Sequence, residues 1–126
     1  MKKYLLLITI VTSVLLCNAQ NAPWKEFDNF HHLVSKALHP VMTGNVQPVK
    51  DSSSALLASA KTWQASAIPA GVDATAFKTS SRELVKQCTI LNDDVHSKQP
   101  VNVLKAQAVK VHDTFHALLA ACKLKD

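Results

Sequence analysis

Four stretches of the chain place apolar residues at alternating steps of three and four, a spacing that puts them on one face of an α-helix. The stretches begin near Pro23, Pro48, Asp73 and Val101. Each apolar stripe must pack against partner helices to be stable, and the links between the stretches are short. The sequence therefore predicts an all-α fold, an antiparallel up-down-up-down four-helix bundle over residues 20–126.

Each stripe defines a seam of residues that we expect in the core. The seams are, in chain order, Trp24, Phe27, His31, Val34, Leu38 and Val41; Val49, Ser53, Leu56, Ala60, Trp63 and Ala67; Phe77, Ser81, Leu84, Cys88, Leu91 and Val95; and Val101, Leu104, Ala108, Val111, Phe115, Leu118 and Cys122. Gly44 and Asn45 suit the first link, Pro48 suits a first helical turn, and Asp73 is the expected N-cap of the third helix. The chain has only two glycines, which disfavours a β-rich fold with many tight turns.

The first 19 residues have the layout of a secretory signal peptide. Lys2 and Lys3 precede an apolar run, and a small residue, Ala19, stands where a signal peptidase would cut. The run is too short for a permanent membrane anchor. Lipid attachment at Cys17 is the alternative, but Leu16 stands where that reaction needs a small residue. We expect an exported protein, periplasmic or secreted.

The charge pattern gives no support to nucleic-acid binding. The formal charge is +5, and it falls to +3 once Lys2 and Lys3 are removed. The remaining basic residues are scattered singly among acidic ones, without a basic block or interleaved aromatic residues.

His31 is the one ionisable residue among the predicted seam positions. A buried imidazole needs hydrogen bonds or a metal ion to satisfy its nitrogens. With turns near residues 45, 70 and 98, antiparallel pairing places His31 at the level of about residue 114 on the fourth helix. His112 and His116 lie on either side of that level and share one face, because residues four apart on a helix are neighbours. The small residues Ala60 and Ser81 are expected to leave room for a ligand there.

These three histidines predict a transition-metal site, with Zn, Cu or Ni held between helices one and four. Imidazole suits all three metals, and three nitrogens do not select among them. His39 is read as a C-terminal helix cap or as an accessory ligand, and His32, pointing about 100° away from His31, as a solvated residue or accessory ligand. His96 is expected to cap its helix. The predicted role is metal buffering, sensing or delivery in the cell envelope.

The cysteines and the acidic residues give no catalytic arrangement, so we expect a binding protein and not an enzyme. Cys88 and Cys122 would lie about 14 residues apart in height, roughly 20 Å along the axis, too far for a disulfide. We expect Cys88 to be a buried small residue, and Cys122 either the same or a ligand at a separate place. Asp113 is a weak candidate for orienting a histidine ligand.

The four seams together resemble those of the exported four-helix-bundle proteins of the cytochrome c′ and cytochrome b562 type. The resemblance is architectural, and the covalent haem motif Cys-x-x-Cys-His is absent near the C-terminus. It implies that non-covalent haem b could be ligated from helices one and four, where His31 and His116 would lie. The stretches around His31, His39 and His112 to Cys122 are also similar to those of an uncharacterised exported bacterial family.

Two alternatives to a metal-binding protein therefore stay open. One is a haem-binding or electron-transfer bundle with histidine ligation. The other is a structural or interaction bundle without a ligand, whose histidines hydrogen-bond to backbone or water. The sequence identifies no protein partner.

Overall fold

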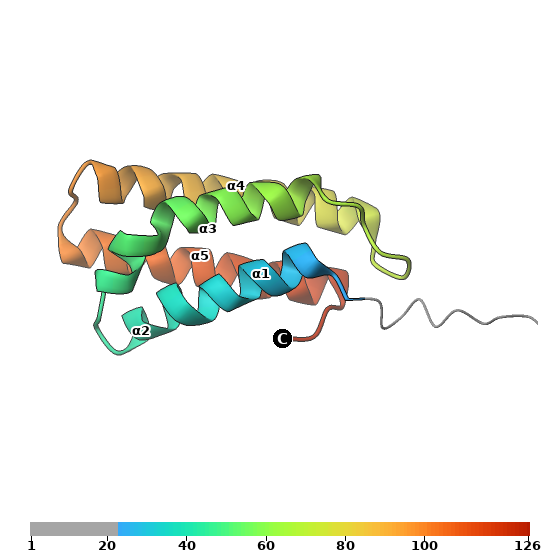
Figure 1. Ribbon diagram of the computed structural model, residues 1–126, viewed down its shortest axis with the longest axis horizontal. Helices are drawn as coiled ribbons and strands as arrows, with labels where there is room; N and C mark the ends of the chain where they lie inside the picture. The colour runs from blue at the N-terminus through green and yellow to red at the C-terminus, as the bar shows by residue number, and fades with distance from the viewer. Residues whose placement is uncertain (1–22) are drawn as a thin grey trace, which may run out of the picture.

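A computed structural model describes residues 23–126, and this part of the chain is helical without a strand. The predicted signal peptide lies outside the described residues. The long helical segments of the described chain pack side by side (Figure 1). The first, which we call helix one, is continuous but has three parts, and the others are single helices. The elements are α1 (Lys25–Leu33), η2 (Val34–Leu38) and α2 (His39–Met42), which form helix one, then α3 (Gln47–Ala65), α4 (Ala74–His96) and α5 (Val101–Cys122).

Helix one changes its hydrogen-bonding pattern halfway along its length. The segment η2 is a π-helix, and the backbone N–H of His39 donates to the carbonyl of Val34, five residues earlier. Pro40 follows at once. Proline has no N–H to donate, and its ring clashes with the carbonyl four residues earlier in a regular α-helix. The π-turn takes up one extra residue here, and the chain continues as α2 beyond the proline.

The helix ends follow the local sequence. Asp73 accepts a hydrogen bond at Oδ1 from the backbone N–H of Ala76 (3.0 Å), as predicted for the N-cap of α4. Pro48 lies in the first turn of α3. Gly44 has φ +93° in the link after α2, a conformation that L side chains rarely adopt. At the other end of α4, Nδ1–H of His96 donates to the carbonyl of Asn92 (2.8 Å), the capping contact that we expected.

Each helix packs against two others around one core. α4 contacts α3 and α5, whereas helix one contacts α3 through α1 and η2, and α5 through η2 and α2. The largest fully buried side chains include Trp63, Phe30, Phe77 and Phe115. Trp24 closes one end of the core, because its indole N–H donates to Ser66 Oγ (2.9 Å) just after α3.

Most seam positions of α3, α4 and α5 are buried as predicted, with three exceptions. Ala67 lies beyond the end of α3 and is exposed, Val101 is 51% exposed at the start of α5, and Val95 is only partly buried. Gln87 is buried although it was not predicted. Its side chain is hydrogen-bonded to Glu83 (2.6 Å) and to Gln107 of α5 (2.9 Å), so its polar atoms are satisfied.

The predicted seam of helix one is wrong at its centre. Phe30 is fully buried, whereas Phe27 and His31 lie on the flank of the helix and are partly exposed. The two neighbours Phe30 and His31 differ by about 100° around the axis. Burying the phenyl ring and leaving the imidazole at the edge avoids the cost of desolvating two ring nitrogens.

Candidate functional site

His112 and His116 lie one turn apart on the side of α5 next to helix one and turn toward each other. Their Nε2 atoms are 3.1 Å apart, and their ring centroids are 4.4 Å apart. The side chain of His112 is 18% exposed and that of His116 is 38% exposed, so the pair is open to solvent. We call these two residues the histidine pair.

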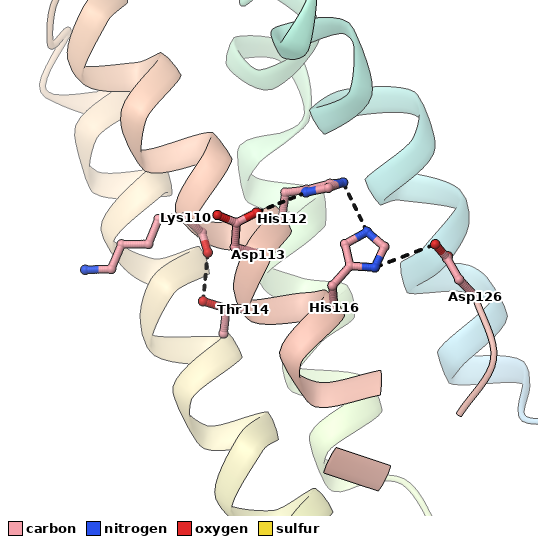
Figure 2. A network of polar contacts seen from close by, with 6 residues as sticks. All are labelled: Lys110, His112, Asp113, Thr114, His116 and Asp126. Carbon is pink, nitrogen blue, oxygen red and sulfur yellow. Dashed lines mark hydrogen bonds and ion pairs between the residues drawn. The ribbon is translucent and has the colours of Figure 1, made fainter. Parts of the chain in front are cut away.

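A carboxylate stands beside the outer nitrogen of each ring of the histidine pair (Figure 2). Oδ1 of Asp113 lies 3.5 Å from Nδ1 of His112, and Oδ2 of Asp126 lies 3.6 Å from Nδ1 of His116. A carboxylate accepts hydrogen bonds and does not donate them, so each favours the tautomer with its proton on Nδ1. Asp113 therefore lies where it can orient the ring of His112, a role for which the sequence made it only a weak candidate.

These tautomers leave two unprotonated Nε2 atoms facing each other. At 3.1 Å their lone pairs repel, unless one ring carries its proton on Nε2 and donates it to the other ring, or a metal ion lies between them. The first arrangement is an N–H···N hydrogen bond, and in the second the metal ion binds both nitrogens. With metal–nitrogen bonds of about 2.0–2.1 Å, the observed separation corresponds to an angle of roughly 100° at the metal. That angle lies between square-planar and tetrahedral geometry.

His31 joins the same cluster but does not reach the histidine pair directly. Its ring stacks on Phe27 and tilts against Phe115, with ring centroids 5.7 Å apart in both contacts. Its Nε2 lies 2.9 Å from Oδ1 of Asp126 and donates to it, because the carboxylate is the acceptor. Asp126 thus bridges His31 and His116, and this hydrogen bond occupies one of the two ring nitrogens of His31.

Asp126 was not among the predicted site residues, because it lies after the last helix. Lys123 adopts the left-handed conformation (φ 55°). The next residue, Leu124, donates from its N–H to the carbonyl of Leu119 (2.9 Å) and packs against the core. These features form a Schellman turn, which reverses the chain. The reversal directs Asp126 back toward helix one. An apolar residue two positions after a helix end was the available signal.

His39 lies beside the histidine pair on its other side. Its ring centroid is 5.4 Å from that of His112, in an edge-to-face arrangement, and its side chain is exposed. No hydrogen bond from its ring to a helix-end carbonyl is found among the described contacts, and both interpretations of His39, helix cap and accessory ligand, stay predictions. His32 is exposed, and no contact places it near the cluster.

Within residues 23–126, no three histidine, cysteine, aspartate or glutamate side chains are placed to hold a metal ion together. The cluster offers two converging nitrogens, and any third ligand has to come from a side-chain rotation. The core beneath is filled: Phe115 contacts Phe30 and Trp63, at centroid distances of 5.5 and 6.2 Å. Ala60 and Ser81 are themselves buried, so the space expected between the helices is taken by aromatic rings. A haem at that level stays a prediction.

Cys88 and Cys122 are both free, as the height estimate predicted, and both are buried. Burial raises the pKa of the Cys88 thiol to about 12. Burial, and then the negative charge of Asp73, raise the pKa of Cys122. Both residues are therefore neutral thiols near neutral pH, in a form that binds metal poorly.

No known protein family matches the sequence, and neither a curated protein nor a solved structure matches it significantly. The resemblance to the cytochrome c′ and b562 bundles thus remains a prediction from the seams. None of the helices described here has the length and apolar character needed to cross a membrane. The described chain is an all-helical protein with four long helical segments and a histidine cluster on one face.

Proposed function

We propose that this chain is an exported four-helix bundle of up-down-up-down topology that binds a transition-metal ion, Zn, Cu or Ni, at the histidine cluster between its first and last helices. It serves in metal buffering, sensing or delivery and carries no catalytic centre. Export rests on the signal-peptide layout of the first 19 residues. Metal binding rests on the cluster around the histidine pair.

The observation that carries this proposal is the convergence of the two Nε2 atoms at 3.1 Å, with a carboxylate beside each Nδ1. Histidines that bind metals usually donate their other ring N–H to a carboxylate, carbonyl or water, which fixes the tautomer and raises the basicity of the ligating nitrogen. His112 has such a partner in Asp113, at 3.5 Å, and Asp126 lies within ion-pair distance of Nδ1 of His116, at 3.6 Å. The neutral nitrogen donors favour Zn, Cu and Ni over Mg or Ca, which prefer oxygen.

Thermal unfolding of the metal-free protein, with and without added Zn²⁺, Cu²⁺ or Ni²⁺, tests this proposal. A ligand at about 100 times its Kd stabilises the folded state by about 2.7 kcal/mol. For a chain of this size that is a rise in Tm on the order of 10 °C. His112→Gln combined with His116→Gln should abolish the rise, and acidification should weaken it, because a protonated imidazole cannot ligate.

A matched control removes two other histidines. His32 and His96 are exposed and lie outside the cluster, so replacing both with Gln should leave the metal-dependent rise in Tm unchanged. If the parent protein shows no rise with any of the three metals, or if the control variant loses the rise and the His112 and His116 variant keeps it, the proposal is wrong.

A further inference from the structure

The histidine pair supplies two nitrogens, and a stable site for these metals takes at least three protein ligands. Two imidazoles on helix one flank the pair: His31 beyond His116 and His39 beside His112. They differ in what already holds them. His31 donates from Nε2 to Asp126 at 2.9 Å and stacks on Phe27, whereas His39 is exposed and contacts His112 itself.

We infer that His39 is the third ligand of this site. We also infer that the π-turn η2 places His39 on the side of helix one that faces α5. This inference rests on the proposed metal-binding function and deepens it. The site then spans helix one and α5, and it binds the metal through three neutral imidazoles with a fourth position open to solvent. His31 and Asp126 act beside it as positioning residues for His116.

The backbone explains why His39 can face α5. Eight residues of a regular α-helix turn the chain by two turns and roughly 80° more. His39 would then point well away from the side of helix one that carries His31. The π-turn takes up one extra residue, so the two histidines are related as if they were seven apart, which leaves only about 20° between them. The π-type hydrogen bond from the N–H of His39 to the carbonyl of Val34 lies at this point.

The backbone at His39 is also held in place by its buried neighbours. Leu38 and Val41, which lie on either side of His39 and Pro40, are fully buried, and α2 packs against α5. The backbone of His39 is thus held by the core while its exposed side chain is free to rotate. Such a rotation would bring a ring nitrogen toward the Nε2 atoms of the pair, from a starting centroid distance of 5.4 Å to His112. π-turns inside α-helices occur frequently at functional sites.

The test is calorimetric titration of the chain over residues 20–126 with Ni²⁺ and Zn²⁺, for the parent protein and three single variants. His39→Gln should weaken metal binding on the order of 100-fold. Residues that only orient a ligand change metal affinity by about 10- to 100-fold, so the loss of a ligand should equal or exceed the largest of those effects. His31→Gln should weaken metal binding by no more than about 10-fold. His96→Gln, on the far helix α4, should have no effect.

Electron paramagnetic resonance of the Cu²⁺-loaded protein separates a ligand from a merely structural residue. The nitrogen hyperfine pattern should indicate three imidazoles in the parent protein and in His31→Gln, and two in His39→Gln. Thermal unfolding of the metal-free variants shows whether each is folded, and His39→Ala serves as a second variant should His39→Gln unfold.

Three results would overturn the inference. If His31→Gln loses one nitrogen and His39→Gln does not, the third ligand is His31. If neither changes the nitrogen count, solvent completes the site; in both cases the proposed function survives. If the parent protein binds no metal, or binds it after loss of both His112 and His116, the proposed function fails together with the inference.

Discussion

Replacing Cys88 should make the stability of this protein less sensitive to alkaline pH. The thiol is 1% exposed in the core, and burial raises its pKa from 9.0 to about 12. In the unfolded chain the thiol ionises near pH 9, but in the folded protein it stays neutral. The unfolded state therefore releases a proton that the folded state keeps, and the folded state loses stability as pH rises above about 9.

The size of this effect follows from the gap between the two pKa values. One pH unit above the unfolded pKa, at about pH 10, the loss attributable to Cys88 is about 1.4 kcal/mol. It grows by a similar amount for each further unit until the folded thiol ionises, at a pKa of about 12. Below about pH 8 the contribution of Cys88 to the pH dependence is close to zero.

Urea unfolding of the parent protein and of Cys88→Ala, under reducing conditions between about pH 7 and pH 10, measures this difference. Cys88→Ala should be less stable than the parent near neutral pH, because the substitution leaves a small cavity. The gap between the two proteins should narrow by about 1.4 kcal/mol at about pH 10. Lysine and tyrosine titrations are common to both proteins and cancel. A gap that stays constant across this range would refute the assignment of a neutral, buried thiol.

Two further substitutions test the packing and the helix start. Phe115→Ala should cost about 3–5 kcal/mol in urea unfolding, because a fully buried ring that contacts Phe30 and Trp63 is removed; a cost below about 1 kcal/mol would mean that this ring is not in the core. Asp73→Ala should cost about 1 kcal/mol through loss of the N-cap, whereas Asp73→Asn should keep most of it. Burial, and then the negative charge of Asp73, raise the pKa of Cys122. Asp73→Asn should therefore lower that pKa and speed labelling of Cys122 by a thiol reagent at mildly alkaline pH; an unchanged rate would contradict this electrostatic effect.

The sequence predicted the three helices from Gln47 onward well because their seams obey a simple period. Ser53, Cys88 and Phe115 are buried where the three-and-four spacing places them. Asp73 and Pro48 mark helix starts by mechanisms that act within one turn. These features depend on neighbours along the chain, and so a single sequence contains them.

The buried face of helix one could not be predicted from the same spacing. Its register is set by competition between Phe30 and His31 for the core, which depends on the facing helices α3 and α5. The π-turn adds one residue to the helix in a way that periodic counting does not anticipate. Since His39 comes after that turn, its position beside His112 could not be predicted from a regular helix with 3.6 residues per turn.

The sequence predicted which histidines lie in the candidate site better than it predicted how they are arranged there. His31, His112 and His116 do belong to one cluster, but the first of them reaches it through Asp126, a residue that follows the last helix. A contact made by a chain segment after a helix end depends on the left-handed conformation at Lys123. Lysine rarely adopts that conformation, so the residue type at this position did not indicate the turn.

The bridge from His31 to Asp126 has a consequence for the order of the helices. His31 lies within the first two turns of α1, so a hydrogen bond of 2.9 Å to Asp126 brings the two ends of the folded region close together. A short glycine-serine linker could join them. The link at Gly71, exposed and with open space where a Cβ would lie, offers a place to open new ends. A circular permutant that starts with α4 and ends with α3 would keep every helix contact, since the same surfaces meet whichever residue is synthesised first.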